Sequence, residues 1–105
     1  MTDRELLELA AKAAGITVSW SNQSVFRQPQ TNEGVEWNPL TDDGDALRLA
    51  VKLRLSIDIN EYDQMIHVFT DLLDYGCSLD FTGDICADTR RAIVIAAAEI
   101  GKGME

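Results

Sequence analysis

One histidine and two cysteines are the residues of this chain best suited to hold a transition metal: His67, Cys77 and Cys86. A structural zinc site needs four ligands and usually has closely paired cysteines, and the spacing of these three residues matches no such pattern. His67 lies in an alternating segment between Met65 and Phe69, where a partly buried structural imidazole is the more common role. We therefore predict no metal site and no cofactor.

Covalent catalysis is equally hard to place on this sequence. It has no G-x-S-x-G nucleophile elbow and no glycine-rich phosphate loop after a strand, and its one histidine leaves few candidates for a general base. The 18 carboxylates offer many pairs for glycoside chemistry, but nothing singles out one pair. We expect a protein that is not an enzyme, with a weak hydrolase whose carboxylates converge on His67 as a remaining alternative.

Acidic residues dominate one long interval of the chain. The net charge is −9, from 18 acidic and 9 basic residues, and it works against nucleic-acid binding because phosphates are repelled. No lysine or arginine lies between Arg54 and Arg90, and the acids there alternate with aromatic residues, which suits docking on a basic protein. The predicted partner-binding residues are Asp58, Glu61, Tyr62, Asp63, Asp71, Asp74, Tyr75 and Asp80. The alternative is a solvated face that only keeps the protein soluble.

Two adjacent arginines, Arg90 and Arg91, fall early in a predicted helix, where cations oppose the helix dipole. We favour ion pairing as the explanation. The expected partners are Asp80, Asp84 and Asp88. The alternative is a guanidinium fork for phosphate or carboxylate with Trp37 as a stacking face, which would make the chain a small-ligand or nucleotide-binding, sequestering protein.

Three carboxylates around a glycine, in the stretch TDDGD, raise the question of a calcium loop. A loop that began at Asp42 would need oxygen ligands where Gly44 and Ala46 stand and a bidentate glutamate where Leu53 stands. At the start of a helix, by contrast, free amides and the helix dipole favour carboxylates. We therefore interpret the stretch as a helix start capped by Asp42.

Helices are predicted in three places: residues 2–15, 42–54 and 85–100. Thr2 and Glu5 form a capping box, and Gly15 and Gly101 supply the stops of the first and last helices. The middle helix is apolar over most of its circumference, which implies contact with more than one neighbour or a homodimer interface.

Alternating apolar and polar residues predict two hairpins and one short extra strand. The hairpins span residues 16–28 and 56–69, and the extra strand spans residues 35–37. Polar and glycine-containing stretches at residues 28–34 and 70–83 are predicted to be irregular.

The elements combine into a single α+β domain over residues 1–105 in the order αββαββα. We expect an antiparallel sheet of four or five strands layered with the three helices. No segment reaches the roughly 18 apolar residues that a membrane helix needs, and the first residues lack the layout of a secretory signal. Two cysteines without such a signal favour reduced thiols in a cytoplasm, with no membrane contact.

Three stretches of the sequence resemble a known family: RELLELAAKAAGI, WNPLTDDGDALRLAVKL and TRRAIVIAAAEIGK. The family is the phage ABA-sandwich domain, found in short proteins of tailed phages and prophages, and the likeness covers about half of the chain. It does not extend over residues 21–34 or 58–84. The resemblance implies a helix–sheet–helix sandwich and a phage or prophage origin, but no activity and no site residue.

Origin and charge together lead to the expected function. We expect a small acidic accessory protein in the cytoplasm of a bacterial host, acting without catalysis. It would bind a basic host protein, and inhibition of a host defence or regulatory factor is the role that this origin favours.

Overall fold

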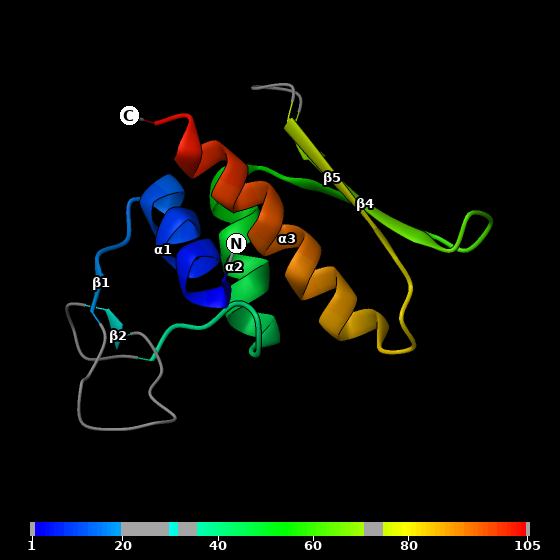
Figure 1. Cartoon of the computed structure of the whole chain (residues 1–105), viewed down its shortest axis with the longest axis horizontal. Coiled ribbons are helices and arrows are strands. Elements are labelled where there is room, and N and C mark those ends of the chain that lie inside the picture. The colour runs from blue at the N-terminus through cyan, green and yellow to red at the C-terminus, as the bar shows by residue number, and fades with distance from the viewer. Residues whose placement is uncertain (1, 20–29, 32–35, 71–74, 105) are drawn as a thin grey trace.

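The computed structural model describes residues 2–19, 30–31, 36–70 and 75–104. In chain order the elements are α1 (Asp3–Ala14), β1 (Val18–Ser19), β2 (Gln30–Thr31), α2 (Asp43–Leu53), β3 (Ser56–Asn60), β4 (Met65–Thr70), β5 (Tyr75–Asp80) and α3 (Ile85–Lys102) (Figure 1). The α+β class and the three helices are confirmed. Two strands lie between α1 and α2 and three lie between α2 and α3, whereas two strands were predicted in each place.

Capping residues set where the first two helices begin. The hydroxyl oxygen of Thr2 accepts a hydrogen bond from a first-turn backbone N–H at 3.2 Å, and α1 ends at Gly15 with a left-handed φ of 72°. Asp42 caps α2 by accepting from the Asp45 backbone N–H at 2.8 Å. α2 also ends in a left-handed residue, Arg54 at φ 55°, where no glycine signals the stop.

The main sheet has three antiparallel strands in the order β3–β4–β5. Strand β5 corrects the prediction that residues 70–83 are irregular. Its sequence, YGCSLD, contains glycine and aspartate, which are poor strand formers, and its pairing along the whole of β4 outweighs that preference. Cys77 and Leu79 alternate with more exposed neighbours, as in a strand with one covered face.

A separate ladder of two short antiparallel strands joins β1 to β2. The first strand of the predicted hairpin is therefore present, the return strand predicted before residue 28 lies outside the described residues, and β2 falls where a loop was predicted. Of the extra strand predicted at residues 35–37, Glu36 is a single bridge residue, Trp37 lies in no strand, and residue 35 lies outside the described residues. The described strands thus form a sheet of three and a ladder of two, not one sheet of four or five.

Helix α3 lies between the sheet and the other two helices (Figure 1). It packs against β4 and β5 on one side and against α1 and α2 on the other. Ile66 and Val68 of β4 are 0% exposed, while His67 and Phe69 belong to the opposite face of the sheet. Among the described residues all three helices therefore lie on one face of the sheet, which differs from the expected helix–sheet–helix layering.

The backbones of α1 and α3 approach each other closely. Buried alanines occupy both helices, including Ala10 in α1 and Ala97 in α3. At Gly101 a Cβ atom would overlap the backbone carbonyl of Leu9, so only glycine fits there without movement of a helix. None of the described helices is long and apolar enough to cross a bilayer.

Candidate functional site

The face of the main sheet that points away from the helices is open and polar. Strand alternation and register place its side chains in cross-strand rows. The middle row is Asp58, His67 and Ser78. A neighbouring row pairs Met65 of β4 with Asp80 of β5. We call this surface the open sheet face.

His67 is held at the centre of the open sheet face by two hydrogen bonds. Its Nδ1 lies 2.8 Å from the Ser78 hydroxyl oxygen and its Nε2 lies 2.8 Å from Asp63 Oδ2. Asp63 belongs to the β3–β4 turn, where its other carboxylate oxygen accepts from the Met65 backbone N–H at 3.0 Å. The turn is shaped by Asn60, whose side-chain oxygen accepts from the Tyr62 backbone N–H at 2.9 Å.

Ser78, His67 and Asp63, linked by hydrogen bonds, have the composition of a hydrolase triad, and no sequence motif predicted this arrangement. The nitrogens, however, are used in the opposite sense: Nδ1 of His67 faces Ser78 and Nε2 faces Asp63, whereas in serine hydrolases the carboxylate orients Nδ1. Ser78 also lies within a strand of the sheet rather than at a strand-to-helix turn, where the nucleophile of such hydrolases stands. We interpret these hydrogen bonds as the support that orients a partly buried imidazole, so the structural role predicted for His67 fits its geometry.

The carboxylates of the predicted partner-binding surface fall on or beside the open sheet face where they are described. Asp58 and Asp80 point outward from β3 and β5, and both are exposed. Glu61 and Tyr62 lie at the exposed tip of the β3–β4 turn. Within the described part of the chain, no hydrogen bond or ion pair engages the carboxylates of Asp58, Glu61 or Asp80.

Three further predicted residues are only partly placed. Asp71 and Asp74 lie outside the described residues, and for Tyr75 the structure gives its backbone position at the start of β5. Phe69, which the prediction did not include, adds an exposed aromatic ring to the open sheet face, at 41% exposure. Its alternation with Val68 was the sequence signal that could have placed it there.

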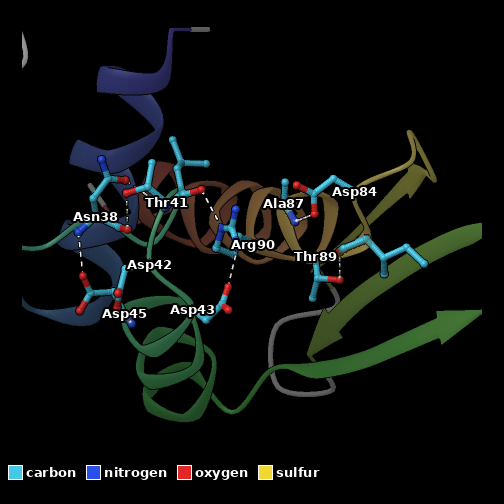
Figure 2. A network of polar contacts seen from close by, with 11 residues as sticks. Asn38, Thr41, Asp42, Asp43, Asp45, Asp84, Ala87, Thr89 and Arg90 are labelled. Atoms are coloured by element: carbon cyan, nitrogen blue, oxygen red, sulfur yellow. Dashed lines mark hydrogen bonds and ion pairs between the residues drawn. The ribbon is translucent and has the colours of Figure 1, made fainter.

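The two adjacent arginines form ion pairs with acidic residues of other helices. Figure 2 shows Arg90 of α3 reaching to Asp43 at the start of α2. The distance from Arg90 Nη1 to Asp43 Oδ1 is 2.6 Å. The Nε–H of Arg90 donates to the carbonyl oxygen of Leu40 at 2.9 Å. Arg91 pairs with Asp3 of α1 at 3.1 Å. Ion pairing is confirmed, but the predicted acids were wrong because the partners lie far away in sequence.

The acids that were expected to pair with these arginines have other roles. Asp84 caps α3 by accepting from the Ala87 backbone N–H at 3.0 Å, and Asp88 accepts two hydrogen bonds from Thr82. Trp37, the proposed stacking face, is buried at 6% exposure. No described contact joins Trp37 to either arginine, so the structure does not bring the predicted ligand-binding residues together.

The acidic stretch at the start of α2 is a helix start, as predicted. Asp42 is the N-cap, and Asp43 forms the ion pair with Arg90. Asp45 is buried, and its carboxylate accepts from the Asn38 backbone N–H at 2.9 Å (Figure 2). The same carboxylate pairs with Arg48 at 2.7 Å. Each carboxylate therefore has a structural task. No group of three or more potential metal ligands occurs among the described side chains.

An apolar groove on the helix side of the sheet was not predicted. It lies between α2, β3 and the first half of α3 and has a volume of about 250 Å³. Leu47, Ile57, Ile59, Ile85 and Ile93 are its main lining residues. Leu47 is 60% exposed and Ile59 is 49% exposed, so the groove gathers large apolar side chains at the surface. The excess of apolar residues around α2 was the available sequence signal.

Two titratable groups outside these surfaces have shifted pKa values. The hydroxyl and then the backbone N–H of Thr82 lower the pKa of Asp88, because both hydrogen bonds favour the carboxylate. Burial, and secondarily the charge of Glu99, raises the pKa of the Cys77 thiol. Cys77 and Cys86 are both free thiols.

Fold and site together define a small α+β protein with three helices on one face of a three-stranded antiparallel sheet and an acidic, open opposite face. No family model matches the chain, and no curated protein or solved structure is similar to it.

Proposed function

We propose that this protein acts without catalysis, by binding a basic partner protein through the open sheet face. The observation that carries the proposal is the state of Asp58, Glu61 and Asp80. These carboxylates are exposed, and no described cation neutralises them. Since residues 55–89 contain no lysine or arginine, the charge of this surface is available to a partner.

The open sheet face offers apolar contact as well as charge. Phe69 is exposed and Met65 is half-buried, and both lie among the carboxylates of the face. Aromatic and methionine side chains supply area at the centre of protein interfaces, while charges around them speed the encounter and select the partner. The backbone of a three-stranded sheet is already ordered before binding, so the loss of conformational entropy on binding is small.

The resemblance to the phage ABA-sandwich family suggests where such a partner would be met. We propose a phage or prophage accessory protein that works in the cytoplasm of a bacterial host. A nucleic-acid-binding defence or regulatory factor has the basic groove that an acidic surface would occupy. Inhibition would then follow from steric and electrostatic occlusion of that groove.

The experiment is affinity capture from bacterial lysate, followed by measurement of the dissociation constant of the recovered protein at several salt concentrations. The test variant carries Asp58→Asn, Glu61→Gln and Asp80→Asn. We expect a basic partner whose affinity falls about tenfold between roughly 0.05 and 0.5 M NaCl, because salt screens exposed charges. The test variant should bind more weakly by about tenfold or more at low salt.

A matched control removes the same amount of charge elsewhere. Glu5→Gln, Glu8→Gln and Glu99→Gln lie on α1 and α3, away from the open sheet face. Binding that does not respond to salt, or that weakens equally in the test and control variants, would show that the open sheet face is not the electrostatic docking surface.

A further inference from the structure

Strand β3 forms one edge of the main sheet, since the strand order is β3–β4–β5. Ser56, Ile57, Asp58 and Ile59 are all exposed, Ile57 at 38% and Ile59 at 49%, so neither face of this strand is fully covered by described residues. An exposed edge strand carries unpaired backbone N–H and C=O groups and pairs readily with another extended chain. Natural proteins usually protect such edges, but the only charge on β3 is Asp58.

The two faces of β3 differ sharply in chemistry. On the helix side, Ile57 and Ile59 form one wall of the apolar groove, with Leu47 and Ile85 facing them from α2 and α3. On the opposite side, Asp58 belongs to the acidic open sheet face. A strand added beside β3 would therefore place alternate side chains in an apolar and an acidic environment.

We infer that the edge of β3 binds an extended segment of the basic partner as an added strand. This inference rests on the proposed function and specifies the partner further. The segment alternates apolar residues, which enter the groove, with lysines or arginines, which lie beside Asp58 and the β3–β4 turn. Backbone hydrogen bonds to β3 supply affinity, and the alternation supplies specificity.

Charge makes a second copy of this chain a poor occupant of the edge. Each copy has a net charge of −9, so two copies repel each other. An antiparallel pair of β3 strands centred on Asp58 would place two aspartates directly opposite, which destabilises the pairing. A basic segment gains attraction at the same positions.

Synthetic peptides test the inference on the full chain. The probe is an octapeptide that alternates lysine with valine, and the reference has the same composition with the four lysines grouped before the four valines. Two further probes carry N-methyl groups on all lysines or on all valines, so that each blocks the hydrogen bonds of one strand edge. The readouts are the dissociation constant and hydrogen exchange of the Ser56–Asn60 amides.

We expect the alternating peptide to bind at least about tenfold more tightly than the grouped one and to slow exchange in β3. One N-methylated form should lose binding while the other keeps it, because only one edge of the peptide faces β3. Ile57→Thr with Ile59→Thr keeps strand-forming residues but should weaken binding by about tenfold. Met104→Thr, an exposed apolar residue outside the groove, is the control.

The outcomes separate this inference from the proposed function. Absence of binding, equal binding of alternating and grouped peptides, or no effect of the Ile57→Thr and Ile59→Thr pair overturns strand addition, whatever the captured partner does. If the Asp58→Asn, Glu61→Gln and Asp80→Asn variant binds the captured partner as tightly as the wild type, the carboxylates do not guide binding. That result overturns the electrostatic part of the inference and the proposed function with it. A dimer in sedimentation that the threonine pair dissociates assigns the edge to a second copy and overturns the partner segment.

Discussion

Asp88 shows at the scale of one residue how this chain uses a carboxylate inside the molecule. It accepts from the Thr82 backbone N–H at 2.8 Å and from the Thr82 hydroxyl at 2.6 Å. These bonds tie the segment after β5 to the first turn of α3, and they lower the pKa of Asp88. A lowered pKa means that the folded state holds the charged form more tightly than the unfolded state.

The first prediction follows from that shift. Stability from Asp88 is present above the ordinary aspartate pKa and is lost as pH falls below it through the lowered value. Asp88→Asn should therefore reduce the urea midpoint near pH 6 and make the loss of stability toward pH 2 less steep. Asp58→Asn is the control, since no described group pairs with it. If the wild type and Asp88→Asn lost stability equally steeply between pH 6 and pH 2, the prediction would be contradicted.

His67 illustrates what spacing along the sequence does and does not reveal. Its place on an alternating strand predicted a partly buried imidazole, and its side chain is 28% exposed. Ser78 could not be foreseen as a partner, because the register of β4 and β5 brings it to His67 and local propensity does not fix register. Asp63 lies only four residues from His67, in the β3–β4 turn, and the shape of that turn decides its contact.

At the scale of elements, the contact between α1 and α3 depends on Gly101. The carbonyl of Leu9 occupies the space that a side chain at Gly101 would need. We predict that Gly101→Ala forces the helices apart and destabilises the fold by about 1–3 kcal/mol, despite the better helix propensity of alanine. Denaturant unfolding measures this change.

Gly103→Ala is the matched control for Gly101→Ala. Gly103 follows α3 with φ −81°, which any residue adopts, so its replacement should change stability by no more than about 0.5 kcal/mol. Equal effects at the two positions would show that helix propensity, rather than the close approach to Leu9, decides the outcome.

Helices were the elements that the sequence predicted best. Thr2, Asp42 and Gly15 are local signals, and each acts within a few residues of its own position. The strand β5 was missed because its stability comes from pairing with β4, which the composition of residues 75–80 does not reveal. The end of α2 agrees with the predicted boundary at residue 54, although no glycine marks it and the left-handed conformation of Arg54 is held by its context.

At the scale of the whole molecule, the sequence revealed the acidic interval but not which of its carboxylates face outward and which stabilise a helix. Asp58 and Asp80 share the open sheet face, while Asp84 and Asp88 serve the start of α3. Composition cannot separate these roles, because they depend on which side of a strand or helix each carboxylate occupies. The apolar groove was missed for the same reason.

Net charge leads to a prediction for the whole molecule. A charge of −9 on 105 residues destabilises the compact state through self-repulsion, which salt screens. We predict that about 0.3 M NaCl at neutral pH raises the free energy of unfolding by about 0.5–1 kcal/mol. The Asp58→Asn, Glu61→Gln and Asp80→Asn variant should be more stable at low salt and gain less from NaCl. A stability that falls with salt would mean that the internal ion pairs outweigh the repulsion.

The central position of α3 also affects how the chain is made. α1, α2 and the sheet are translated before α3, and α3 is the element that packs against all of them. A nascent chain on the ribosome therefore keeps the apolar side of each earlier element exposed until residues 85–102 have emerged. We expect chaperone contact with the nascent chain to be most frequent just before that point.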